Sequence, residues 1–145
     1  MKWGEIQIIA LQKMFATDES ILFENYDNLK NNDDCRIYFE GMIPTANEAI
    51  QLIRPHIQNA YEYDTTNKKY KRTTVEIIDD TYTKDTELEL PYEACVLIPL
   101  YIASQLYKDD DISLATQYRN EFEAGLKELE INIEPPTQIE GVYYV

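Results

Sequence analysis

Glycine, histidine and cysteine are scarce in this chain of 145 residues, which has 4 glycines, 1 histidine and 2 cysteines. The glycines are too dispersed to build the loop that cradles phosphate groups, and neither a GxSxG nor an HExxH motif occurs. A catalytic dyad built on His56 would need Cys35, Cys95 or a serine as its nucleophile, and no local signature supports one. We therefore predict that the chain is not an enzyme and has no catalytic, metal-binding or cofactor-binding residues.

The two cysteines do not suggest a disulfide framework. Cys35 and Cys95 lie in apolar, helix-like contexts and lack CxxC spacing. This pattern is typical of small buried hydrophobic residues in a protein made in a reducing compartment. The opening sequence MKWGEIQ has an early Glu5 and no uninterrupted apolar stretch, so we expect no secretory signal.

Basic residues are also in short supply. The chain has 13 Lys and Arg against 27 Asp and Glu, which gives a net charge of −14 at pH 7. A nucleic-acid-binding domain displays a basic face, and this composition disfavours one. No apolar run approaches the roughly 20 residues that are needed to cross a bilayer. We expect neither nucleic-acid recognition nor a membrane location.

Helical periodicity is what the chain has in abundance, and it is strongest between Glu87 and Leu129. Residues 91–108 are apolar almost all the way round, and a helix without a polar face must be covered on most sides. Pro91 suits a first helical turn, whereas Pro99 removes one hydrogen bond and predicts a kink. The other helices can cover only part of this one, so we expect a neighbouring subunit to supply the rest.

The acidic elbow Asp109-Asp110-Asp111 separates this helix from a second helix at residues 112–129. Asp111 can act as the N-cap, and all three carboxylates favour the positive end of that helix. The elbow lacks the spaced D-x-D-x-D-G pattern of a calcium loop, so we favour capping over a cation site. Apolar residues recur on one face of residues 112–129, and the two helices should form an antiparallel hairpin.

Two more helices are predicted earlier in the chain, at residues 4–16 and 35–57, because apolar residues recur there at helical spacing. Pro44 lies inside the second of them. It either kinks one long helix or separates two shorter ones, and the capping-box spacing of Thr45 and Glu48 leaves room for a break at residues 41–44.

Residues 61–90 are polar and rich in threonine and tyrosine. Thr73–Ile78 and Thr86–Leu90 are predicted strands of a short β-hairpin insertion at residues 70–90. A two-stranded hairpin is marginal alone, so it should pack on the helices or on a neighbouring chain. Residues 130–145 contain Pro135-Pro136, lack a helical period and end in Val-Tyr-Tyr-Val. We predict an extended C-terminal arm docked on a partner, with a disordered end as the alternative.

The predicted fold is therefore one mainly-α domain over residues 1–145. It is a small helical bundle with a C-terminal helical hairpin, a short β-hairpin insertion and a C-terminal arm. Three regions are candidate partner contacts: the tail, the basic cluster (whose alternative is a solvated loop tip) and the polar face of the last helix. Their residues are Ile139, Val142, Tyr143, Tyr144 and Val145; Lys68, Lys69, Tyr70, Lys71 and Arg72; and Arg119, Glu123 and Lys127.

The stretch from Glu87 to Leu129 resembles the C-terminal helical hairpin of the head–tail connector (adaptor) proteins of tailed bacteriophages that infect Gram-positive bacteria. The segments WGEIQIIALQKMF and RIYFEGMIPTANEAIQLI are similar to the first helices of that family. The resemblance covers about two-thirds of the chain, in the same order. Members of the family carry a longer, β-rich insertion where this chain has only residues 61–90, so an additional surface domain is not implied.

The resemblance implies a structural protein of the virion neck, made in the cytoplasm of the bacterial host. Such adaptors form a closed ring, commonly of about twelve copies, through heterologous contacts. The implied partners are further copies of the chain, the portal protein above the ring, and a stopper or tail completion protein on the tail side. DNA passes through the ring without specific binding, which suits a charge of −14 because acidic groups repel phosphate.

A different class of protein also suits a small acidic chain, namely an inhibitor that mimics the charge of DNA and blocks a host nucleic-acid-binding protein. Such a mimic needs carboxylates spaced over one surface, whereas here they are spread over caps, loops and helix faces. We therefore favour the adaptor. The oligomeric state would distinguish a ring from a monomeric or dimeric mimic.

Overall fold

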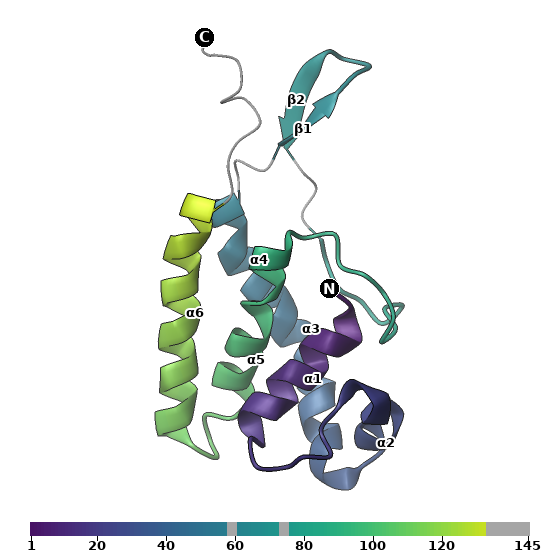
Figure 1. The fold of residues 1–145 in the computed structure, drawn as a ribbon, viewed down its shortest axis with the longest axis vertical. Helices are drawn as coiled ribbons and strands as arrows, with labels where there is room; N and C mark the ends of the chain where they lie inside the picture. Colours follow the sequence, from purple (N-terminus) through teal and green to yellow (C-terminus); the bar gives the residue numbers. More distant parts are fainter. Residues whose placement is uncertain (58–60, 73–75, 133–145) are drawn as a thin grey trace.

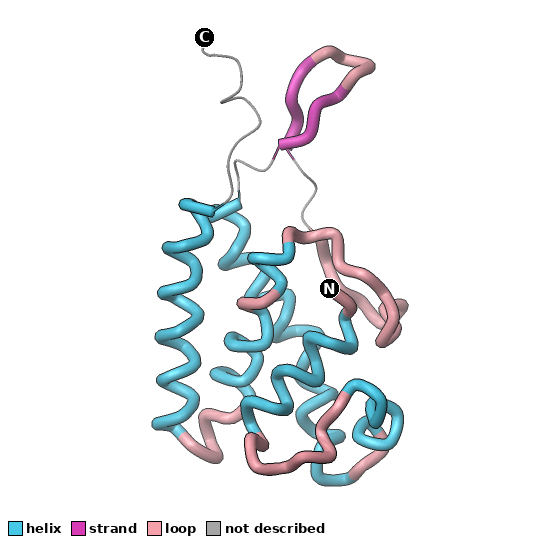
Figure 2. The backbone as a smooth tube through the Cα atoms, viewed as in Figure 1, coloured by secondary structure: helices cyan, strands magenta, loops and turns pink. Residues whose placement is uncertain are grey.

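Helices dominate the computed structural model of the chain, which describes residues 1–57, 61–72 and 76–132 (Figures 1 and 2). This confirms the mainly-α class. The longer helices are α1 (Trp3–Met14), α3 (Asp33–Ile53), α5 (Ile98–Leu106) and α6 (Ile112–Asn132). The shorter elements are η1 (Phe23–Asn25), α2 (Tyr26–Lys30), η2 (Arg54–Ile57), β1 (Tyr61–Asp64), β2 (Lys69–Arg72) and α4 (Tyr92–Cys95).

The apolar helix α5 lies at the centre of the bundle, and its most extensive contacts are with α6, α3 and α1. Ile98, Ile102 and Ala103 are fully buried. Removing such side chains from water is the main favourable term in folding. The expectation that a neighbouring subunit must complete the cover is wrong for α5, because three helices of the same chain supply it.

The helical hairpin predicted from the sequence is formed by α5 and α6, which lie side by side and are joined by residues 107–111 (Figure 1). The backbone N–H of Leu114 donates to Asp111 Oδ1 at 3.0 Å. This is the bond that an N-cap aspartate makes to the first turn of a helix. The predicted capping role of Asp111 is therefore confirmed.

A break, not a kink, interrupts the apolar helix predicted at residues 91–108. The chain forms α4, then a turn at residues 96–97, then α5. Pro99 lies in the first turn of α5, where its missing N–H is not needed. Because Pro99 cannot donate to the carbonyl of Cys95, the first helix ends there and a new one begins.

Helix α3 is continuous through Pro44, so of the two alternatives the single long helix is formed and the break at residues 41–44 is not. Thr45 does not cap a new helix. Its hydroxyl donates to the carbonyl of Gly41 at 2.7 Å, one turn earlier in the same helix. The true N-cap is Asn32, whose Oδ1 accepts from the N–H of Asp34 at 2.8 Å. The helix therefore begins two residues before the predicted start at Cys35, and η2 continues it to Ile57.

The strands predicted at Thr73–Ile78 and Thr86–Leu90 are not formed in the described part of these segments; residues 73–75 lie outside it. The paired strands are β1 and β2, which lie earlier in the chain. Ile78 is buried against the helices instead. Its N–H donates to Asn47 Oδ1 and its carbonyl accepts from Asn47 Nδ2, both at 2.9 Å. A side chain of α3 thus satisfies the groups that a second strand would have paired.

Residues 84–88 pair with the N-terminus of the chain. The N–H of Trp3 donates to the carbonyl of Thr86 at 2.8 Å, and the N–H of Leu88 donates to the carbonyl of Met1 at 3.0 Å. An isolated bridge joins Lys2 to Glu87. This segment therefore holds the start of α1 and does not belong to a hairpin.

Helix α6 continues to Asn132, beyond the predicted end at Leu129. The predicted arm therefore cannot begin at residue 130, and the rest of it, residues 133–145, lies outside the described residues. Within the described ranges, no helix combines the length and the apolar character that a membrane crossing requires.

Candidate partner-binding surface

The predicted tail contacts lie outside the described residues. They are Ile139, Val142, Tyr143, Tyr144 and Val145. Helix α6 fixes where this tail begins. Its last described turn lies at the same end of the bundle as α4 (Figure 1).

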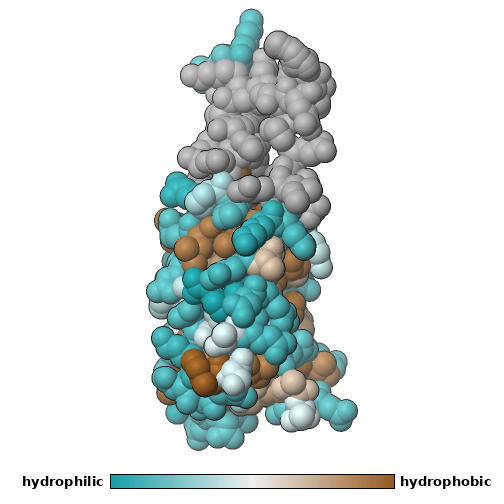
Figure 3. Space-filling model, turned by 90° about the vertical axis from the view of Figure 1, so that its left-hand side faces the viewer, coloured by the Kyte–Doolittle hydropathy of each residue, from teal (hydrophilic) through white to brown (hydrophobic). Residues whose placement is uncertain are grey.

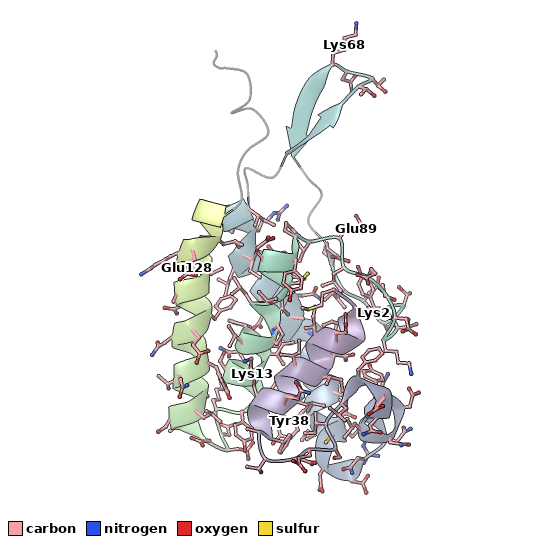
Figure 4. The ribbon with its side chains drawn as sticks, in the orientation of Figure 1. Lys2, Lys13, Tyr38, Lys68, Glu89 and Glu128 are labelled. Carbon is pink, nitrogen blue, oxygen red and sulfur yellow. The ribbon has the colours of Figure 1, made fainter. Side chains whose placement is uncertain are left out.

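The predicted basic cluster lies in the turn and the second strand of a β-ribbon. Lys68 belongs to the turn, is exposed and has a φ of 55° (Figure 4). In the antiparallel pairing of β1 with β2, Glu62 is opposite Lys71 and Asp64 is opposite Lys69. Opposite charges at directly facing positions are favourable. Two of the predicted basic contacts therefore have acidic register partners in their own ribbon.

The same register pairs the remaining positions of the two strands. Tyr63 pairs with Tyr70, and Tyr61 pairs with Arg72. Tyrosine and arginine are enriched at protein interfaces.

The sequence-based prediction missed this ribbon because it assigned the strands further along the chain. The available signal was the alternation in YEYD and in KYKR, on either side of a four-residue polar segment. Such alternation across a short polar turn is typical of a hairpin.

The polar face of α6 carries Arg119, Glu123 and Lys127, and all three belong to the described surface. Arg119 Nε donates to Glu123 Oε2 at 2.9 Å, and the Arg119 guanidinium lies 5.2 Å from the centre of the Tyr101 ring. An exposed pair at this helical spacing contributes only about 0.3–0.5 kcal/mol. Arg119 and Glu123 are thus engaged within the chain, and Lys127 is exposed.

A groove with a volume of 210 Å³ lies between α4 and the C-terminal half of α6. It is lined by Tyr92, Glu93, Val96, Leu97, Gly125, Glu128 and Leu129. Gly125 matters to its shape, because a Cβ at this position would come within 2.3 Å of Leu97 Cδ2. Glycine therefore lets Leu97 pack against the backbone of α6. We call this feature the α4–α6 groove.

The surface around the groove is mixed in character. Figure 3 views the α6 side of the molecule and shows separate brown hydrophobic areas surrounded by teal. Tyr92, at the edge of the groove, is 65% exposed. Glu93 and Glu128 are also exposed (Glu128 is labelled in Figure 4), and neither has a hydrogen-bond or ion-pair partner among the described residues. Periodicity could not reveal this site, because its two walls are about thirty residues apart in the sequence.

A second cavity, with a volume of 430 Å³, lies beside α1, α2 and α3. Gln7 and Tyr26 meet in its wall, where the Tyr26 hydroxyl donates to Gln7 Oε1 at 2.6 Å. Burial raises the pKa of Tyr26. Lys30 and Arg36 on the cavity lining are matched by Glu40 and Asp80, so the site has no strong charge preference. Its polar wall is thus held by a hydrogen bond between α1 and α2.

The two cysteine thiols lack the features of a reactive nucleophile. Burial raises the pKa of the Cys95 thiol to about 11 and also raises that of Cys35. A reactive cysteine has a lowered pKa and a partly exposed thiol, whereas both thiols are buried. In residues 1–57, 61–72 and 76–132, no three His, Cys, Asp or Glu side chains gather as metal ligands would.

An aromatic cluster supports the elbow between α5 and α6. Phe15, Tyr38 and Tyr107 meet with ring centres 5.4 to 6.4 Å apart. The Tyr38 hydroxyl donates to Asp110 Oδ2 at 2.8 Å. One of the three elbow carboxylates therefore ties the hairpin to α3, and this bond accounts for Asp110 without a cation.

We expect the chain to lose stability as the pH rises from about 10 to 12. Burial, with the hydrogen bond to Asp110, raises the pKa of Tyr38 from 10.0 to about 12, and burial also raises the pKa of Tyr101. The stabilising contribution is complete below pH 10, where tyrosines of the unfolded chain titrate, and it is lost as pH approaches 12. Urea unfolding at several pH values should show a falling midpoint.

The variant Tyr38→Phe should reduce this alkaline loss, because it removes one of the shifted groups. Tyr92→Phe is the matched control at an exposed position. A midpoint that stays constant from about pH 9 to 12 would contradict the prediction.

The chain has no match among protein-family models, curated proteins or solved structures. Its function must therefore be inferred from the residues and the geometry described above.

Proposed function

We propose that the chain is a head–tail adaptor of a tailed bacteriophage. It assembles into a ring below the portal, joins the capsid to the tail and lines the channel for DNA. The observation that carries this proposal is the resemblance of residues 87–129 to the C-terminal hairpin of that family. In the structure this stretch forms the centre of the bundle, with α5 covered by α6, α3 and α1, which supports its role as the core of the subunit.

The distribution of surfaces supports an assembling protein. The ribbon formed by β1 and β2 and the α4–α6 groove are different parts of one chain. Contacts between unlike surfaces are heterologous, and they close into a ring when the rotation between neighbours allows it. In this proposal the exposed side of α6, with Arg119, Glu123 and Lys127, faces a neighbouring subunit.

The charge of the chain supports a role beside DNA that does not include binding it. The net charge is −14. Exposed carboxylates lie at the elbow, along α6 and in the loops before α4. A channel lined by acidic groups repels phosphate, so that DNA can pass without adhering. The partners in this proposal are further copies of the chain, the portal protein and a stopper or tail completion protein.

We expect the chain to be a component of purified phage particles and to bind the portal protein of the same phage. Mass spectrometry of the particles and labelling with an antibody against the recombinant chain would locate it at the neck. A pull-down with purified portal protein would test the contact. A chain that is absent from the particles and does not bind the portal would contradict the proposal.

The contribution of the tail can be tested with a chain that ends at Asn132, because this truncation keeps all of α6. We expect it to fold with an unchanged helical content and to bind the portal at least about tenfold more weakly, which corresponds to about 1.4 kcal/mol. A truncated chain that binds the portal with the full affinity would contradict the arm and leave the adaptor role intact.

A further inference from the structure

We propose that the cavity beside α1, α2 and α3 binds a small uncharged aromatic molecule that carries a carbonyl group. We call this cavity, which has a volume of 430 Å³, the Gln7 cavity. Ligand-binding pockets have volumes of about 300–1,000 Å³, are mainly apolar and hold a few polar groups that orient the ligand. Binding at this cavity is a property of the single chain and does not depend on the adaptor role.

Gln7 supplies the cavity with an unused hydrogen-bond donor. Only 4% of its surface is exposed, and its side chain lines the cavity. Its Oε1 accepts from the Tyr26 hydroxyl at 2.6 Å, which fixes the orientation of the amide. Nε2 donates to no group in the described part of the chain, and it is not one of the fully enclosed polar atoms without a partner, so it is open to the cavity. Because a buried donor without a partner is unfavourable, the cavity favours a ligand that brings an acceptor.

Aromatic rings line the cavity beside this donor. They belong to Trp3, Tyr26, Phe39 and Tyr82. The rings of Tyr26 and Phe39 meet at 84° with their centres 5.4 Å apart, and both side chains are buried, as is that of Trp3. Packing therefore fixes these walls before a ligand enters. Aromatic rings pack on one another edge to face or offset, so a flat ring suits the walls better than an aliphatic group does.

The charged groups of the lining favour an uncharged ligand. Both signs are present on it, with Lys30 and Arg36 against Glu40 and Asp80. Arg36 Nη2 lies 3.1 Å from Asp33 Oδ1, and the Lys30 ammonium lies 5.9 Å from the centre of the Tyr26 ring. Both cations are thus already engaged within the chain. A charged ligand of either sign would meet a like charge on the lining and would also lose its hydration.

Benzamide is a suitable probe, because it is a flat uncharged ring with a carbonyl oxygen. Trp3 is the only tryptophan of the chain and lines the cavity, so its fluorescence reports on the bound ligand. We expect benzamide to change the Trp3 emission saturably and to raise the melting temperature, since a ligand that binds only the folded chain stabilises it. Cyclohexanecarboxamide, which lacks the aromatic ring, and benzoate, which is charged, should each bind at least about fivefold more weakly.

Gln7→Met tests the donor, because it removes the amide and keeps the length of the side chain. We expect it to weaken benzamide binding at least about fivefold. Gln12→Met is the matched control: it makes the same change on α1 and removes a hydrogen bond from Gln12 Nε2 to the carbonyl of Ile21, but Gln12 does not line the cavity. Its affinity should stay within about twofold of the wild type. Nuclear Overhauser effects between benzamide and the Trp3 indole in the wild-type chain provide a measurement that needs no variant.

Three results would overturn the proposed site. Benzamide at up to about 10 mM, a high concentration for a ligand of this size, would leave the Trp3 emission and the melting temperature of the wild-type chain unchanged. Folded Gln7→Met would bind benzamide as tightly as Gln12→Met does. Cyclohexanecarboxamide or benzoate would bind as tightly as benzamide. Each of these results would leave the adaptor role intact, because that role is tested by phage particles and portal binding.

Discussion

Phe122→Ala is expected to lower the free energy of unfolding by about 3–5 kcal/mol, the range for truncating a large buried aromatic side chain. Phe122 is fully buried on α6, and its ring lies 5.0 Å from that of Tyr101 on α5. It is thus the main aromatic contact between the two helices of the hairpin. Its loss removes apolar burial and leaves a cavity in the interface of α5 and α6.

Urea unfolding followed by circular dichroism would measure this loss. Ile112→Ala is the matched control, because Ile112 lies on the same helix and is 65% exposed. Exposed substitutions usually change stability by less than about 0.5 kcal/mol. If the two variants unfold at the same urea concentration, the packing of α6 on α5 is not what stabilises the hairpin.

Gly4→Ala is expected to destabilise the chain by about 1–3 kcal/mol, the usual effect of overpacking. A Cβ at Gly4 would lie 2.7 Å from both Cβ and the carbonyl oxygen of Lys84, and 2.8 Å from Phe23 Cε1. The N–H of Gly4 also donates to the Lys84 carbonyl at 3.0 Å. The backbone on both sides of the contact is therefore fixed, and the added methyl group must push the 84–86 segment away from α1.

Gly41→Ala provides the contrast. There the added Cβ would meet Leu106 Cδ2 at 2.9 Å, which is the mobile end of a side chain. Gly41 lies inside α3, where replacing glycine by alanine is worth about 0.5–1 kcal/mol. The cost of the contact with Leu106 and the benefit of replacing a helical glycine offset each other. The free energy of unfolding should therefore change by less than about 1 kcal/mol. Thermal unfolding of both variants decides the matter: a Gly41→Ala protein less stable than Gly4→Ala would contradict this reasoning.

Local physics explains why the helices were predictable. Helical spacing of apolar residues located α1, α3, α5 and α6, and the side chain of Asp111 marked the start of α6. These features depend on residues three or four positions apart, which a sequence shows directly. The mainly-α class followed from the same pattern.

The strand prediction failed because the partner of a backbone group is a tertiary matter. Residues near Ile78 have strand propensity, but the two backbone groups of Ile78 pair with Asn47, which is 31 residues away on α3. Thr86 and Leu88 pair in turn with the first residues of the chain. Strand propensity reflects packing on a surface more than a preference of the backbone, and the helices supplied a surface that the sequence does not display.

The candidate partner-binding surface was likewise predicted only in part from the sequence. The sequence showed a basic cluster within residues 68–72, but only the pairing of β1 with β2 decided that Lys69 and Lys71 are opposite acidic residues. The groove required α4 to pack against α6, with Gly125 allowing the approach of Leu97.

The amino-acid sequence by itself thus determined the helices, the capped elbow of the hairpin and the acidic character of the chain. The helices and the cap follow from residues that are close together in the sequence. The acidic character follows from the sum of the side-chain charges. Only the tertiary structure decided that α5 is covered within one chain, where the strands pair and which surfaces remain for a partner. These features depend on contacts between residues far apart in the sequence. The free energy gained by burying those residues depends on how the whole chain packs.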